Sequence, residues 1–384
     1  MVQKTQRGAT ALFIVIFSTL LLSVITVSFV GLINRDKVQS TDNELSQSAY
    51  DASLAGVEDA KRVLAACLGG NGNNSSACAA MNAGECSTIV ASGVVGSSGV
   101  EGETLLKTLQ GDGEDINQAY TCVKASLDSD DVLYELPKEQ SRMIPIRAAG
   151  SVNQIEIQWQ KNGDAGIAAP LSGAHTGSCT EGKLCTLEDW GNMPSLMRVQ
   201  LITPGSAINL STLDDSNQGA TFFLYPSLAG GAPQAIEQSI TARYTSTAES
   251  SGLKTVTSCS KTQFTVGYAC TARIRLANPI SANNGLSFIR LTSLYKNASV
   301  RVSLKDNSGG AVQFRGVQPV VDATGRANDV FRRVEARLST LTNAIYPEAA
   351  VDITGSGNSG SVCKNFYVTD STSGDNNTSL SCTP

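Results

Sequence analysis

The sequence predicts an α+β fold, in which a long N-terminal α-helix packs on a large, β-rich globular head that contains disulfide bonds. Three observations predict it. An N-terminal stretch lacks charge, an amphipathic stretch follows it without a helix breaker, and the remainder combines alternating apolar and polar residues with ten cysteines. Roughly 316 residues follow the helical part, which is enough for one large domain or two smaller ones.

The first stretch, residues 9–33, carries no charged side chain, and Lys4 and Arg7 stand just before it. As a helix, these about 25 residues would extend about 37 Å, more than the roughly 30 Å of a bilayer's hydrocarbon core. The run is longer than the apolar part of a cleaved signal peptide, and it ends without an A-x-A-like site. We therefore expect a transmembrane helix. Arg35 and Lys37 balance the charges before it, so charge alone does not orient it.

The second stretch, residues 34–68, is amphipathic. It contains no proline, and Gly69-Gly70-Asn71-Gly72 ends it, as glycine commonly does just beyond a helix. Nothing breaks the helix near Ile33, so one helix is predicted over 9–68. Its apolar residues recur at spacings near three and four, which predicts a stripe covered by the head. They are Val38, Leu45, Ala49, Ala52, Val57, Ala60, Val63 and Leu64.

The ten cysteines all follow the predicted span. An even number on one side of a membrane is typical of an oxidising compartment and of disulfides. Proximity suggests the pairs Cys179–Cys185, Cys259–Cys270 and Cys363–Cys382, and it leaves two further bridges among four cysteines whose pairing stays open. Those four are Cys67, Cys78, Cys86 and Cys122.

The head, residues 69–384, reads mostly as strands, because apolar and polar residues alternate over several segments. These segments are Val152–Gln160, Met197–Thr203, Gln263–Leu276, Leu286–Tyr295 and Ala298–Leu304. Residues 69–118 and 205–250 are rich in turn formers and receive no assignment. The head forms either one lobe or two, with a boundary near 163–190.

Residues 325–338 admit two interpretations. Val334, Ala336 and Leu338 alternate with charged residues, as in a half-buried strand, whereas a helix would place Val334 and Leu338 on one face with Val330, Leu341 and Ile345. We favour the strand. Arg332 and Arg333 could meet a carboxylate of a neighbouring subunit, but a solvated edge is the simpler reading.

Composition favours an exported structural domain. The formal net charge is −5 and charged residues make up 16%, below the usual quarter, with small polar residues in their place. There is no basic stripe for nucleic acid. We expect no enzyme, no cofactor and no catalytic residue, because nothing around the single histidine, His175, suggests a nucleophile and base. Asp128, Asp130 and Asp131 are secondary calcium candidates, although turns use the same residues.

Residues 6–66 resemble the N-terminus of type IV pilin-like proteins, in particular the PilX-type minor pilins and pseudopilins. The resemblance rests on the basic leader ending in Arg7-Gly8, on Ala9-Thr10-Ala11-Leu12, on the apolar span, and on the segment QSAYDASLAGVEDA at 47–60. Residues 332–338 also resemble the closing R-x-V-E-A-x-L strand of many minor pilins. The resemblance implies a pilin-like fold, with residues 1–8 as a leader that a membrane-embedded prepilin peptidase removes after Gly8, and methylation of Ala9.

The fifth mature position holds Glu in major pilins, where it is thought to pair with a neighbour's N-terminal amine, and holds Phe13 here. That departure implies an initiating or tip position in the pilus. The helix would pack among the helices of other subunits, with small residues permitting close approach. The packing residues we expect are Ala11, Phe13, Ser18, Ser23 and Ser28.

The resemblance thus implies a minor structural subunit of a type IV pilus or pseudopilus. It would cross the inner membrane once before assembly and then reach the pilus at the cell surface, with its head always outside the cytoplasm. The expected partners are other pilins and minor pilins, the prepilin peptidase, the membrane and, as a further option, a tip adhesin. Two rival interpretations are an anchored surface adhesin that never assembles and an anchored envelope hydrolase.

Overall fold

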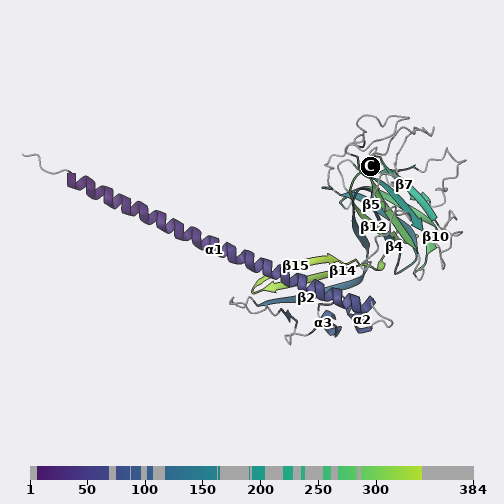
Figure 1. The fold of residues 1–384 in the computed structure, drawn as a ribbon, viewed down its shortest axis with the longest axis horizontal. Coiled ribbons are helices and arrows are strands. Elements are labelled where there is room, and N and C mark those ends of the chain that lie inside the picture. Colours follow the sequence, from purple (N-terminus) through teal and green to yellow (C-terminus); the bar gives the residue numbers. More distant parts are fainter. Residues whose placement is uncertain are drawn as a thin grey trace, which may run out of the picture. The chain divides into compact units, whose positions relative to one another are not determined.

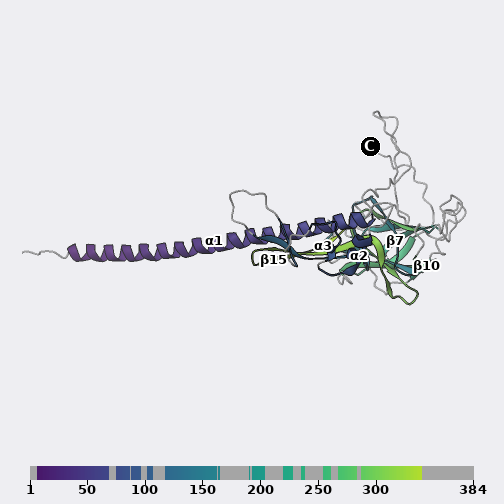
Figure 2. The ribbon, with the colours of Figure 1, turned by 90° about the horizontal axis from the view of Figure 1, so that it is seen from below.

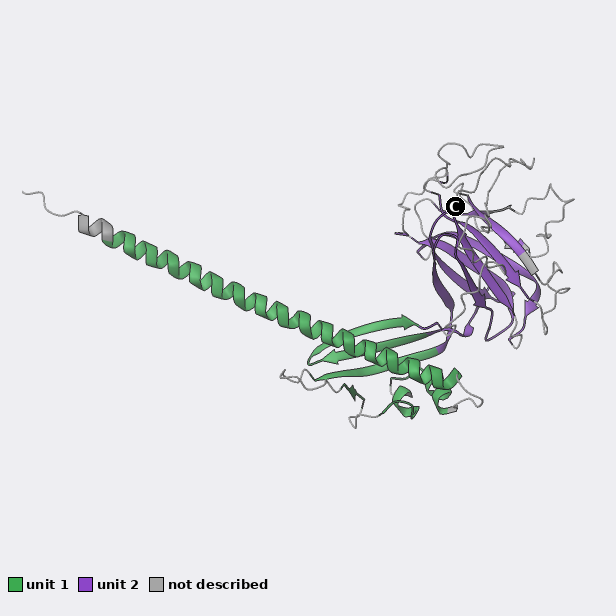
Figure 3. Cartoon of the chain, viewed as in Figure 1, with its two compact units in different colours: residues 1–126, 320–337 green, residues 127–319, 338–384 purple. Residues whose placement is uncertain are grey.

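The computed structural model describes residues 7–68, 75–86, 88–96, 102–106, 117–161, 163–164, 190, 193–203, 219–227, 235–237, 254–260, 267–282 and 287–339. The chain forms two compact units (Figure 3). Unit 1 comprises residues 1–126 and 320–337, and unit 2 comprises residues 127–319 and 338–384. The interval 163–190, which the sequence suggested as a boundary if the head forms two lobes, belongs to unit 2 and lies mostly outside the described residues. A lobe boundary there stays a prediction.

Unit 1 begins with a single helix, α1 (Arg7–Leu68), of 62 residues. It runs without a break through the junction between its apolar and amphipathic halves, as the sequence predicts (Figures 1 and 2). At 1.5 Å per residue its length is about 93 Å. Val38 is 62% exposed, whereas Ala49 and Ala52 are fully buried. The predicted stripe is therefore covered only in the C-terminal third of the helix, and Val38 does not take part in it.

Besides α1, the described part of unit 1 contains two short helices and a four-stranded sheet, two strands of which, β2 and β14, continue into unit 2. The helices are α2 (Ser75–Ala83) and α3 (Thr88–Ala91). The sheet has the order β1-β2-β14-β15, and its strands are β1 (Thr104–Leu105), β2 (Gln118–Ser129), β14 (Phe314–Ala327) and β15 (Val330–Arg337). The sheet thus joins segments that are about 200 residues apart in the chain.

Strands β14 and β15 form an antiparallel hairpin, in which Ala327 pairs with Val330. Its two-residue turn is Asn328-Asp329, and Asn328 has a φ of 48°, in the left-handed region that asparagine tolerates well. The strand interpretation of 325–338 is therefore confirmed for residues 330–337, which form β15, whereas Leu338 lies just beyond the end of that strand. Leu341 and Ile345, on which the helical interpretation also rested, lie outside the described residues.

The described part of unit 2 contains two sheets. The first has the order β13-β12-β5-β10-β8, with β3 also paired to β12, and the second has the order β4-β11-β6-β7-β9. The first sheet is built from β3 (Asp131–Leu136), β5 (Val152–Lys161), β8 (Ala235–Glu237), β10 (Tyr268–Ile280), β12 (Ala298–Lys305) and β13 (Ala311–Val312). The second is built from β4 (Ser141–Pro145), β6 (Leu196–Ile202), β7 (Gly219–Ser227), β9 (Lys254–Ser258) and β11 (Phe288–Leu294).

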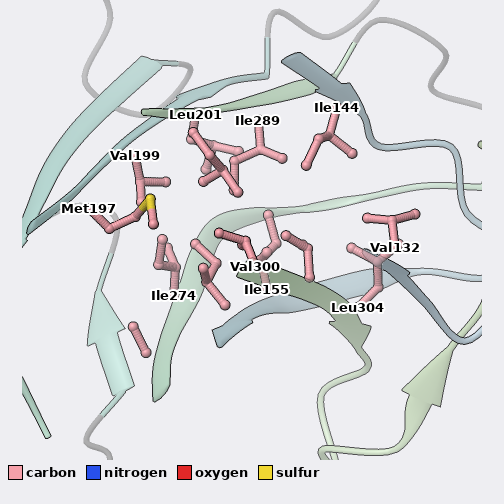
Figure 4. Close-up of a cluster of buried hydrophobic side chains, with 14 of the residues drawn as sticks. Val132, Ile144, Ile155, Met197, Val199, Leu201, Ile274, Ile289, Val300 and Leu304 are labelled. Carbon is pink, nitrogen blue, oxygen red and sulfur yellow. The ribbon is translucent and has the colours of Figure 1, made fainter. Parts of the chain in front are cut away.

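The core of unit 2 lies between these sheets (Figure 4). Ile155 and Ile274 of the first sheet and Val199, Leu201 and Ile289 of the second belong to one cluster of buried apolar side chains. Because alternate residues of a strand point to opposite faces, each strand supplies this cluster from every second position. Unit 2 is therefore a β-sandwich with a core of its own.

The five strands expected from alternation all occur, as β5, β6, β10, β11 and β12, with shifts of a few residues at their ends. The beginning of the predicted strand Gln263–Leu276 lies outside the described residues up to position 266. In β5, Ile155, Ile157 and Trp159 share the core face as expected, and all three are fully buried. However, Glu156 and Gln158 on the opposite face are also buried, at 8% and 5% exposure, so this strand is covered on both sides.

Candidate functional site

The N-terminal half of α1 presents an unusually large apolar surface. Every large apolar side chain from Leu12 to Ile33 is 47–74% exposed, on all sides of the helix. The helix is long and apolar enough to cross a membrane, and none of the apolar window is buried inside the protein. A soluble protein rarely exposes so continuous an apolar surface. This half of α1 is consistent with a single-pass membrane anchor, and it is the candidate functional site.

Four hydroxyl groups in this half donate to carbonyl oxygens of the helix itself. Ser23 donates to the carbonyl oxygen of Leu20 at 2.8 Å, and Ser28 donates to that of Val24 at 2.8 Å. Thr19 and Thr26 donate in the same way to the carbonyl oxygens of Ile16 and Leu22. A hydroxyl bonded back to its own helix needs no water. These groups can therefore sit in lipid or against a second helix without an unsatisfied donor.

The expected packing residues are spread around the helix. Phe13 is 74% exposed, and Ser18, Ser23 and Ser28 are exposed too. At 3.6 residues per turn, Ser23 points about 140° away from Ser18, so the serines do not form one seam. Gly8, Ala9 and Ala11 belong to α1, but the surroundings of these three positions lie outside what the structure describes.

A different set of small polar residues does share one face. Thr19, Ser23 and Thr26 follow the spacing i, i+4 and i+7, which places them on the same side of a helix. Only Ser23 was among the residues expected from the sequence. The same spacing in the sequence could have identified Thr19 and Thr26, because threonine is also frequent where membrane helices approach closely.

The C-terminal third of α1 is docked on the sheet of unit 1. Its buried side chains are mostly small, and two glycines permit a close approach. A Cβ atom added to Gly325 of β14 would lie 2.2 Å from the carbonyl oxygen of Ala49 and 2.3 Å from the amide nitrogen of Ser53. A Cβ atom on Gly56 of α1 would meet Val123 of β2 at 2.8 Å. The backbone of the helix therefore rests almost directly on the backbone of β14.

Polar contacts reinforce this docking. The hydroxyl of Tyr120 donates to Oδ2 of Asp59 at 2.8 Å, and Arg62 Nη1 donates to the other carboxylate oxygen at 3.0 Å. Burial and, to a smaller extent, the Asp59 carboxylate together raise the pKa of Tyr120 to about 12, against a hydrogen bond with Thr104 that lowers it. Arg332 Nε of β15 donates to the hydroxyl of Ser46 at 2.8 Å. Hydrogen bonds from β2 and from β15 thus hold α1 on the sheet.

The arginines of β15 have partners within their own unit. Besides the contact of Arg332 with Ser46, Arg333 forms an ion pair with Asp322 of β14, in which Nε donates to Oδ1 at 2.6 Å. The hydrogen bond from Arg333, more than its charge, holds the pKa of the Asp322 carboxyl below its ordinary value. Both arginines are nevertheless exposed, and β15 is the last strand of its sheet. The prediction of a solvated edge is therefore confirmed, and both side chains also have partners within this chain.

The structure assigns three disulfides among the described cysteines. Cys259–Cys270 occurs as expected. The four cysteines whose pairing stayed open form Cys67–Cys78, which ties the end of α1 to α2, and Cys86–Cys122, which ties the segment after α2 to β2. No described cysteine is free. The expected pairs Cys179–Cys185 and Cys363–Cys382 lie outside the described residues, as does His175.

The calcium candidates are engaged in other contacts. Oδ2 of Asp131 accepts from Nε of Arg301 at 2.6 Å, and Oδ1 of Asp130 accepts from the amide of Gln313 at 3.0 Å. Among the described residues, no group of three or more histidine, cysteine, aspartate and glutamate side chains is arranged to hold a metal ion. Ordinary strand-end and ion-pair contacts account for Asp130 and Asp131.

A long apolar N-terminal helix whose far end is docked on a sheet, followed by a β-rich and disulfide-containing head, is a pilin-like architecture. Comparison with protein-family models, with curated proteins and with solved structures found no match to this chain.

Proposed function

We propose that this protein is a minor structural subunit of a type IV pilus or of a related pseudopilus. The observation that carries the proposal is that one unbroken helix has two different surfaces. The half from Leu12 to Ile33 exposes apolar side chains in every direction, and the last third is packed closely on a sheet. The exposed half of such a helix can cross a membrane and later pack among similar helices, while its last third remains docked on the sheet.

The chemistry of the exposed half supports both environments. Moving it from lipid to a bundle of helices exchanges one apolar surrounding for another, so close packing decides the preference. Hydroxyls that bond to their own backbone allow this exchange without leaving a donor unsatisfied. Thr19, Ser23 and Thr26 form the face that we propose packs against a sibling helix.

The position that we propose in the fibre is the tip or the initiating end. It rests on Phe13, which replaces the glutamate that pairs with a neighbouring N-terminus in major pilins. An apolar side chain here, 74% exposed, favours burial in lipid or in a helix bundle over pairing with an amine. Unit 2, with a core of its own, would then be displayed at the outer surface, where adhesion or the holding of an adhesin is a natural role.

The test is the N-terminus of the mature protein. Mass spectrometry of the chain purified from membranes and from sheared fibres is expected to show a protein that begins at Ala9, with one added methyl group. Gly8→Val is expected to block this processing. Gly31→Val is the matched control, because a Cβ atom at Gly31 would meet nothing within 4 Å, and processing should stay complete.

Retention of MVQKTQRG in the mature wild-type protein would remove the basis for a pilin. The chain would then be a membrane-anchored surface protein that does not assemble. The β-sandwich of unit 2 would suit that second function equally well.

A further inference from the structure

The route by which the chain connects unit 2 to α1 has a mechanical consequence. The chain leaves unit 1 at residues 126–127, returns at 319–320, and leaves again at 337–338 to end in unit 2. The returning segment, residues 320–337, is therefore joined covalently only to unit 2. It is held to α1 by packing and by contacts such as that of Arg332 with Ser46. The only covalent route from unit 2 to α1 runs backward from residue 127.

Two disulfides shorten that route. From residue 127 the chain leads back a few positions to Cys122, and Cys122 is bonded to Cys86. From Cys86 it leads back to Cys78, which is bonded to Cys67 in the last turn of α1. The bridges bypass residues 68–77 and 87–121 entirely. Tension along this route is thus carried by two disulfides and two short pieces of backbone.

We propose that Cys67–Cys78 and Cys86–Cys122 form a covalent strap that carries tension from unit 2 to α1 when the non-covalent contacts of unit 1 give way. The proposal rests on the proposed function only in that a head displayed on an anchored or assembled helix is under load. Its physical basis is the length of chain that each disulfide bypasses. The bridge Cys86–Cys122 spans a sequence separation of 36 residues across a Cα–Cα distance of 4.4 Å.

The strap's effect on extension follows from chain geometry. At about 3.5 Å per extended residue, opening Cys86–Cys122 would add roughly 120 Å to the distance over which the head can separate from the helix. Cys67–Cys78, with a separation of 11 residues, would add roughly 33 Å on the same basis. An intact strap keeps a partly unfolded unit 1 short, so the sheet and α1 stay close enough to dock again after the load falls.

The first test is a nick in the bypassed chain. A protease site is inserted between Leu106 and Asn117 of the full-length protein in detergent, and the protein is cleaved and denatured. On a non-reducing gel the two halves are expected to migrate as one species, and a dithiol reductant should separate them. Halves that separate without reductant would overturn the proposal, and this test needs no cysteine variant to fold.

The variants localise the effect. The double substitution Cys86→Ser with Cys122→Ser is expected to release the halves of the nicked protein without reductant. Cys259→Ser with Cys270→Ser is the control, because that bridge lies within unit 2 and outside the route. Release by the control pair as well would contradict the assignment of the strap to Cys86–Cys122.

The second test measures the strap under force. Handles are attached to azide-bearing amino acids placed at Asp42 of α1 and at Glu139 of unit 2, both of which are exposed, and the full-length protein is stretched in detergent. Adding the reductant should lengthen the extension by about 120 Å and about 33 Å as the two bridges open. Equal extension before and after reduction would refute the strap. Neither test involves the leader or the fibre, so the strap and the proposed function can fail separately.

Discussion

Adding one methyl group to Gly325 is expected to loosen the docking of α1 on its sheet. The new Cβ atom of Gly325→Ala would lie 2.2 Å from the carbonyl oxygen of Ala49, 2.3 Å from the amide nitrogen of Ser53 and 2.8 Å from the carbonyl carbon of Ala52. All three obstacles are backbone atoms of a helix, which cannot rotate aside as a side chain can. Since Cβ contacts shorter than 3.0 Å are essentially never seen, the helix and strand must separate by roughly 1 Å.

The loss of stability caused by Gly325→Ala is expected near the upper end of the usual range for overpacking. Extra methylenes in a packed interior typically cost about 1–3 kcal/mol, and a clash with backbone leaves the least room for relief. Replacing glycine by alanine within a strand would otherwise stabilise the protein by about 0.5–1 kcal/mol. We therefore expect a net loss of about 2 kcal/mol in the free energy that holds α1 on the sheet.

Hydrogen exchange measured by mass spectrometry on the protein in detergent reads this free energy locally. A loss of about 2 kcal/mol should accelerate exchange of the amides in residues 49–64 by roughly 30-fold. Gly56→Ala is the graded comparison. Its Cβ atom would meet the movable side chain of Val123 at 2.8 Å, and alanine gains about 1 kcal/mol of helix propensity, so exchange should change little.

Gly150→Ala is the matched control, because its Cβ atom would meet only Val312, at an ordinary 3.6 Å. Exchange in residues 49–64 should be the same as in the wild type. If Gly325→Ala leaves those amides within threefold of the wild-type rate, the close approach of strand and helix is not what holds α1 in place.

Three further predictions concern Tyr120, Asp322 and Phe13. Tyr120→Phe removes the donor to Asp59 and should lower the free energy of unfolding by about 1 kcal/mol in chemical denaturation. Because the pKa of Tyr120 rises from 10.0 to about 12 on folding, its contribution to the free energy of unfolding is complete below pH 10 and is lost as pH rises through 12. Tyr120→Phe should not show that alkaline loss of stability. Identical alkaline profiles of the variant and the wild type would contradict this prediction. The pKa of Asp322 is lowered from 3.8 on folding, so the ion pair with Arg333 stabilises the protein above about pH 3.8, and this stabilisation is lost as pH falls below that value. Between pH 2 and 6, the free energy of unfolding of Asp322→Asn should therefore change less with pH than that of the wild type. Parallel curves of free energy against pH would rule this out. Phe13→Glu should raise the number of copies per fibre, counted by quantitative mass spectrometry of sheared fibres, and an unchanged count alongside normal membrane levels would argue against the proposed tip position.

The helix and several strands could be predicted because their signals are local. The uncharged run after Arg7 and the absence of a breaker before Gly69 describe α1 within a few residues. Alternation in β5 and β12 likewise needs only neighbouring positions. The extent of docking could not be predicted, because Val38 continues the apolar stripe in the sequence but lies beyond the part of α1 that is covered.

The division into units depends on contacts between distant residues. β2 and β14 lie side by side in one sheet although nearly 200 residues separate them, and no periodicity in either segment identifies the other. The pairing of four cysteines was open for the same reason, since proximity in sequence allows more than one arrangement. Similarly, the partner of Arg333 became evident only once the hairpin brought Asp322 onto the adjacent strand.

The central claim is that the apolar half of α1 occupies lipid first and a bundle of sibling helices afterwards. Photo-cross-linking tests it most directly, with a benzophenone amino acid placed at Phe17 or Phe29, which are 67% and 62% exposed. In the membrane fraction the probes should label lipid, and in sheared fibres both should cross-link the chain to another pilin subunit. Finding only lipid adducts, or none of this protein in the fibres, would contradict the claim.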